Sequence, residues 1–93
     1  MTLKRMYLAT VICRGLTDTE AHEAVTDMLS EFKQPPWQLE VACEWRDGLL
    51  RLSAQNEVDS TGMALLDEFG DAVTAYINYA GEISTEVESV VKL

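Results

Sequence analysis

The chain has 93 residues, which is enough for one domain with a modest core and too few for two. Sixteen acidic residues against seven basic ones give a formal charge of −9, which disfavours direct binding to nucleic acid or to an anionic membrane. No apolar run approaches the ~18 residues that span a bilayer. The opening MTLKRMYLATVICRG has the outline of a short signal sequence but lacks a small-x-small cleavage site. We therefore expect a single domain over residues 1–93, in the cytoplasm, with no membrane segment.

The first predicted strand is Met6–Cys13, which is apolar on both faces and so suits a central place in a sheet. After it, Thr17-Asp18-Thr19-Glu20 has the capping-box pattern of a helix N-terminus. Pro35-Pro36 ends this first helix, because proline disfavours the helical conformation in the residue before it. Its apolar positions have helical spacing and are Ala21, Ala24, Val25, Met28, Leu29 and Phe32.

The middle of the chain predicts a β-hairpin. Two alternating runs, Leu39–Arg46 and Leu49–Gln55, flank Asp47-Gly48, the residue pair typical of a two-residue type I′ turn. The turn sets the register, which places Glu44 opposite Arg51 on one face. The other face is entirely apolar and consists of Val41, Cys43, Trp45, Leu50, Leu52 and Ala54.

A second helix is predicted to start at an N-cap of Asp59 or Ser60 and to run to about Ala80, before Gly81. Its expected inward face is Met63, Leu66, Phe69, Gly70, Val73, Tyr76, Ile77 and Ala80. Its expected outer face carries Leu65, Ala72 and Tyr79. The last run, Ile83–Leu93, predicts an edge strand with one charged face, on which Glu86 and Glu88 lie. The expected buried row of this strand is Ile83, Thr85, Val87, Val91 and Leu93.

This β-α-β-β-α-β order predicts an α+β fold, a two-layer ferredoxin-like sandwich. Its antiparallel four-stranded sheet would have the order 4-1-3-2, with both helices on one face. One apolar row of Met6–Cys13 must then lie on the open face, and the sequence leaves open which row the helices cover. The candidate interaction surface on that face is Met6, Leu8, Thr10, Ile12, Glu44, Leu49, Arg51, Glu86 and Glu88.

The residues that catalyse reactions or bind metals are sparse. Cys13 and Cys43 are expected to be free thiols, because a third strand lies between the two strands that carry them and this separation is too large for a disulfide. Cys13 precedes a helix N-terminus, a setting that can lower a thiol pKa, but a packed structural thiol is the favoured interpretation. The lone His22 and the carboxylates of the first helix, Glu20, Glu23 and Asp27, fit a solvated helix face better than a site. We assign no catalytic, cofactor-binding or metal residue and no cofactor.

Three functional hypotheses remain. The first is a non-catalytic regulatory or protein-interaction domain that self-associates as a homodimer, or docks a partner protein, through the open sheet face. The second is an acidic inhibitor or nucleic-acid mimic that occupies a basic site on another protein. The third is a small-ligand-binding domain or an enzyme with polar groups converging near Cys13, Arg14 or Arg51.

Overall fold

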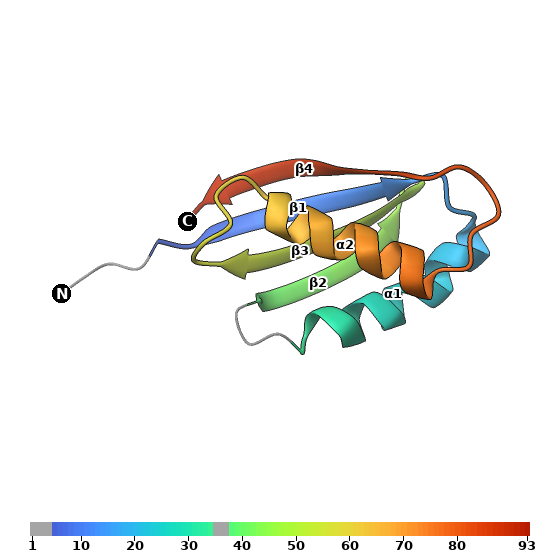
Figure 1. Cartoon of the computed structure of the whole chain (residues 1–93), viewed down its shortest axis with the longest axis horizontal. Helices are drawn as coiled ribbons and strands as arrows, with labels where there is room; N and C mark the ends of the chain where they lie inside the picture. The colour runs from blue at the N-terminus through green and yellow to red at the C-terminus, as the bar shows by residue number, and fades with distance from the viewer. Residues whose placement is uncertain (1–4, 35–37) are drawn as a thin grey trace.

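The computed structural model describes residues 5–34 and 38–93 (Figure 1). The predicted helix stop at Pro35-Pro36 lies outside these residues. The elements are β1 (Tyr7–Arg14), α1 (Asp18–Phe32), β2 (Leu39–Arg46), β3 (Leu49–Asn56), α2 (Met63–Tyr76) and β4 (Ser84–Lys92). All strand pairs are antiparallel and the strand order is β2-β3-β1-β4. This is the predicted 4-1-3-2 order read from the other edge, so the ferredoxin-like sandwich is confirmed.

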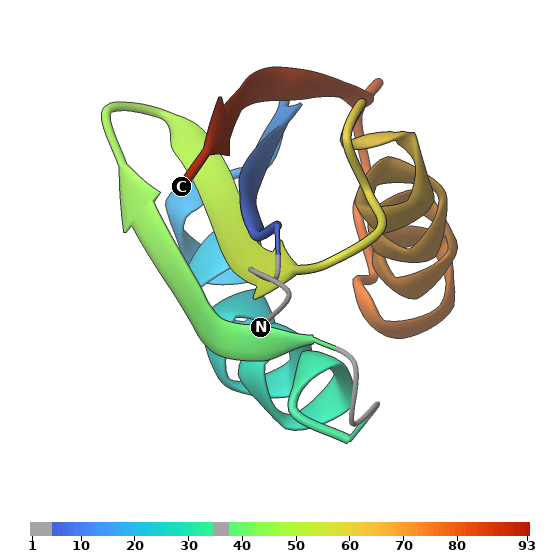
Figure 2. The same cartoon turned by 90° about the vertical axis from the view of Figure 1, so that its left-hand side faces the viewer.

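The two helices share one face of the sheet and divide it between them. α1 packs against β2 and β3, whereas α2 packs against β1 and β4. Figure 2 shows the curved sheet with both helices on the same side of it, α1 at the bottom of the view and α2 at the right, against different halves of the sheet. The core fills the space between the layers, with Val11, Leu52 and Phe69 fully buried. The covered row of β1 is Ala9, Val11 and Cys13, which answers the question that the sequence left open.

The local signals at the first helix and the hairpin are confirmed. The backbone N–H of Glu20 donates to the Thr17 hydroxyl at 3.2 Å, and the Glu20 carboxylate accepts from the Thr17 N–H at 2.9 Å. Asp47 and Gly48 both adopt positive φ, 55° and 75°, as a type I′ turn requires. The resulting register pairs Glu44 with Arg51.

The prediction for α2 was wrong in three respects. The helix ends at Tyr76 rather than near Ala80, and its N-cap is Gly62 in a left-handed conformation. Asp59 nevertheless acts on this end, because its buried carboxylate accepts backbone N–H groups of α2. The helix is also rotated relative to the prediction. Met63 and Tyr76 are about half exposed, whereas the expected outer residues Leu65 and Ala72 are buried.

The expected buried row of β4 also required correction. The register between β1 and β4 shifts between Thr10 and Val11, so that Glu88 is the extra residue of a bulge. A bulge exchanges the two faces of the strand beyond it. Val90 therefore packs on the core beside Val87, while Val91 and Leu93 are 48% and 59% exposed.

Candidate functional site: the open sheet face and the interhelical groove

The structure places the predicted interaction surface on the open face of the sheet. Ile12 of β1 is paired with Arg51 of β3 on one side and with Glu86 of β4 on the other. Arg51 is in turn paired with Glu44 of β2, so one row of side chains crosses all four strands. The neighbouring rows contain Thr10 and Leu8 from the same strand. The predicted residues are thus brought together.

An ion-pair layer made of Arg14, Glu44, Arg51, Glu86 and Glu88 lies over this face. Arg51 donates from Nε and Nη2 to the two carboxylate oxygens of Glu88, both at 2.7 Å. Arg51 belongs to β3 and Glu88 to β4, so this bidentate pair bridges over β1, the strand between them. The Glu44 carboxylate lies 3.5 Å from Arg51, and Arg14 donates to Glu86 at 3.0 Å.

This layer changes what a partner would meet. Ile12 is only 2% exposed and Thr10 9%, although neither α1 nor α2 covers this face. The apolar row that we expected to be open is therefore shielded by the side chains of the same chain. Met6, Leu8 and Leu49 are half-buried around it.

The electrostatics of the layer follow from its geometry. The hydrogen bonds from Arg51 hold the pKa of Glu88 below its usual value, and the charge of Arg14 adds to this effect. Reciprocally, the hydrogen bond to Glu88 raises the pKa of Arg51, and Glu44 contributes in the same direction. Both groups therefore stay ionised at neutral pH.

Sequence reasoning missed an apolar margin at one end of this face. Val91 pairs with Leu8, which points to the open side, and Leu39 pairs with Gln55 in the same row. Val91 is 48% and Leu39 47% exposed. The β4 bulge that turns Val91 outward has no signature in the sequence, since the residues around it are ordinary strand formers.

The polar groups near Arg51 do not form an evident catalytic arrangement. A hollow of about 320 Å³ beside Arg51 is lined by Ala42, Cys43, Glu44 and Ser53. Burial, reinforced by the charge of Glu44, raises the pKa of Cys43 to about 12, so its thiol is protonated. Burial also raises the pKa of Cys13 to about 11, which agrees with a packed thiol and not with an activated one. Both cysteines are free, as predicted.

The acidic residues of α1 have structural partners or face solvent. Glu20 serves the capping box and also accepts the backbone N–H of Ala80 at 3.0 Å, which anchors the α2–β4 connection to α1. Its pKa is lowered, mainly by the hydrogen bond from the Thr17 backbone. His22 is exposed. Over residues 5–34 and 38–93, no three His, Cys, Asp or Glu side chains are arranged to hold a metal ion.

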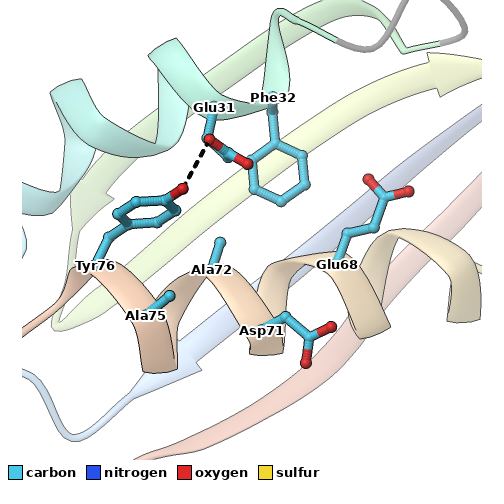
Figure 3. Close-up of a pocket in the computed structure, with 7 residues that line it drawn as sticks. All are labelled: Glu31, Phe32, Glu68, Asp71, Ala72, Ala75 and Tyr76. Atoms are coloured by element: carbon cyan, nitrogen blue, oxygen red, sulfur yellow. Dashed lines mark hydrogen bonds between the residues drawn. The ribbon is translucent and has the colours of Figure 1, made fainter.

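A groove between the two helices was not anticipated from the sequence. It has a volume of about 400 Å³ and lies on the side of the molecule away from the open sheet face. Its lining residues are Glu31, Phe32, Glu68, Asp71, Ala72, Ala75 and Tyr76. In Figure 3, the Tyr76 phenol reaches from α2 towards α1, where it donates to Glu31 at 3.2 Å. We refer to this feature as the interhelical groove.

The rim of the interhelical groove is acidic and its interior is apolar. Burial raises the pKa of Glu68, the charge of Asp59 adds to the rise, and the nearby Gln38 amide partly offsets it. The hydrogen bond to Glu31 raises the pKa of Tyr76. The only signal for this groove in the sequence is that both helices contain acids without lysine or arginine, because helix rotation decides which side chains meet.

Comparisons of the chain with protein-family models, with curated proteins and with solved structures find no match. Neither described helix has the length and apolar character needed to cross a membrane.

Proposed function

We propose that this protein is a non-catalytic regulatory or interaction domain that self-associates through the open face of its sheet. The observation that supports this proposal is the distribution of charge. On this face the three carboxylates of Glu44, Glu86 and the bulge residue Glu88 are matched in number by the three guanidinium groups of Arg14, Arg46 and Arg51. The three arginines are three of the seven basic residues in a chain whose net charge is −9.

Charge balance matters because two copies of an acidic protein repel each other at most orientations. The helical layer is unsuitable for self-contact, since α1 and α2 contain acidic side chains and no lysine or arginine. The open face avoids this repulsion, and its apolar margin at Leu39 and Val91 adds area that gains from burial. A second copy, related by a two-fold axis, is the occupant that fits these features.

The proposal is tested by measuring the mass of the protein in solution over a range of concentrations by analytical ultracentrifugation. We expect a reversible dimer. Ala42 is exposed on the open face in β2, and Ala64 is exposed on α2 in the other layer. Ala42→Glu places a like charge twice in a two-fold interface and should weaken dimerisation about ten-fold or more. Ala64→Glu makes the same chemical change and should leave the dimer intact.

Two results would contradict self-association through this face. One is a wild-type protein that stays monomeric at every concentration. The other is a dimer that Ala42→Glu and Ala64→Glu weaken equally, which would place the contact elsewhere. A monomer whose β1 amide signals shift only when a different protein is added would favour the docking of a partner over self-association.

A further inference from the structure

The interhelical groove combines an apolar interior with an acidic rim on the layer opposite the open sheet face. Phe32 and Ala72 line its interior, and both are almost fully buried by the protein itself. Glu31, Glu68 and Asp71 surround the opening, and the exposed ring of Tyr76 stands at one side (Figure 3). The groove is therefore shaped for an apolar side chain that is flanked by positive charge.

We propose that the interhelical groove binds a basic segment of a partner protein, with one large apolar side chain in the groove and lysine or arginine side chains on the rim. Charge complementarity identifies this occupant. The two helices contain eight acidic residues and no lysine or arginine, so the field at the groove attracts cations and repels anions. This inference goes beyond self-association and does not depend on it.

The extent of the acidic surface favours a polypeptide over a small cation. A second hollow at the same helix interface is lined by Glu20, Glu23 and Asp27 together with Tyr76. With Glu31, these acids form a line along α1 on the side that faces the end of α2. At a helical rise of ~1.5 Å per residue, the line from Glu20 to Glu31 is about 16 Å long. A chain segment with several cationic side chains can contact that length, and a compact ligand cannot.

Specific contacts are available to such a segment. Tyr76 is 53% exposed and lies beside carboxylates, which is a favourable setting for a cation over the face of its ring. The raised pKa of Glu68 shows that this carboxylate is partly desolvated, so a cation that pairs with it would relieve an unfavourable charge. A matching apolar residue in the groove would supply the anchor that typically dominates recognition of a peptide by a groove.

The test uses a labelled amphipathic peptide with leucine on one helical face and lysine and arginine elsewhere, measured by fluorescence anisotropy against the full chain. Two further peptides are required. In one, glutamine replaces the basic residues, and in the other, serine replaces leucine. We expect saturable binding of the first peptide, weakened by added salt, and at least ten-fold weaker binding of the other two. Equal binding of the serine peptide would indicate only diffuse charge attraction and would overturn the proposal.

Variants of the protein locate the binding site. Asp71 lines the groove and Asp67 does not, although both are exposed on α2. Asp71→Asn should weaken binding about two- to five-fold, as expected for loss of one exposed ion pair, and Asp67→Asn should have no effect beyond that of net charge. Ala75→Leu narrows the groove and should abolish saturable binding, with Ala64→Leu as its control on the same helix.

The outcomes separate the possibilities clearly. Circular dichroism first establishes that all four variants are folded. If Asp71→Asn and Asp67→Asn weaken the peptide equally, or if Ala75→Leu binds as well as the wild type, the groove is not the site. If none of the peptides binds saturably at low salt, the proposal is wrong. The readout is independent of the dimer test, since neither Asp71 nor Ala75 lies on the sheet.

Discussion

Replacing Arg51 by alanine should destabilise the protein mainly by exposing Ile12. Ile12 is 2% exposed on a face without helices, and the Arg51 side chain is its direct neighbour on β3. Burying an isoleucine side chain stabilises a protein by roughly 1.5–3 kcal/mol. Arg51 provides cover on one of the two sides of Ile12, so its removal should cost about half of that, ~1 kcal/mol. For a domain of this size the loss corresponds to a decrease in Tm of about 4–8 °C.

The ion pairs of Arg51 are a separate contribution that this free energy does not include. Solvent and salt screen charges at the surface, so the free energy assigned above comes from Ile12 alone. Arg51→Met separates the two effects, because methionine keeps an apolar stem over Ile12 and removes the charge. We expect Arg51→Met to keep Ile12 covered and to lose only the ion-pair contribution, up to about 1 kcal/mol at low salt and less at high salt. Arg46→Ala is the control, since Arg46 is on the same face with a side chain that is 72% exposed.

The assay is urea unfolding followed by circular dichroism at two salt concentrations. The difference between Arg51→Ala and Arg51→Met should persist in high salt, because burial of apolar surface is not screened. The pH dependence has a defined sign. Arg51 lowers the pKa of Glu88, so the contribution of the pair is present above the ordinary carboxyl pKa and is lost as pH falls through the lowered value. Equal unfolding midpoints for the alanine and methionine variants would refute the reasoning.

Three further predictions concern stability and reactivity. Glu68→Gln should raise Tm at neutral pH, because burial raises the pKa of Glu68 and its ionisation therefore opposes folding. The stability of the wild type should rise as pH falls through the raised pKa, and an equal rise in the stability of Glu68→Gln would contradict this reasoning. Gly48→Ala should lower the free energy of unfolding in urea by about 1–2 kcal/mol, because Gly48 has a positive φ, whereas Gly15→Ala should lower it by at least ~3 kcal/mol, because its Cβ would also collide with the Glu82 carbonyl. Similar losses for the two variants would show that the collision at Gly15 is relieved. Burial raises the pKa of Cys13 to about 11 and that of Cys43 to about 12, so both thiols should react slowly with a disulfide reagent near neutral pH until the protein is unfolded. A rapid phase in the native protein would show that one of them is accessible as a thiolate.

The parts of the fold that could be predicted from the sequence are those set by local chemistry. The Asp47-Gly48 turn requires positive φ at both residues and thereby determines the register of the hairpin. The capping box at Thr17 and Glu20 likewise depends on two side chains three residues apart. The order of the elements then leads to the topology, because few arrangements of these elements obey the usual rules of connection.

The features that could not be predicted depend on contacts between distant elements. α2 has apolar residues around much of its circumference, so periodicity alone does not identify its buried side. Its start is set by Gly62 and by the Asp59 carboxylate, which accepts the N–H groups of Ala64 and Leu65. The orientation of α2 about its own axis, which differs from the one expected, buries Leu65 and brings Tyr76 to the interhelical groove. Both the groove and the outward turn of Val91 are therefore consequences of tertiary structure.

The open sheet face was predicted from the two-sided apolar character of β1, but its chemical nature was not. A salt bridge between β3 and β4 that passes over β1 depends on the strand order, on the register and on the bulge at Glu88 together. Sequence reasoning placed Arg51 opposite Glu44, and this pair is present at 3.5 Å. The shorter bonds are to Glu88, whose place beside Arg51 no local pattern indicates.

The two proposed surfaces are compatible because they lie on opposite layers. A dimer formed through the open sheet faces would direct both helical layers outward, which keeps their acidic side chains apart and lowers the repulsion between the copies. Each dimer would then present two interhelical grooves on opposite sides. A partner with two basic segments joined by a linker long enough to reach both grooves would bind the dimer with avidity. The dimer-weakening Ala42→Glu variant separates these effects, since it should reduce binding of such a two-segment peptide while leaving the affinity for a single segment unchanged.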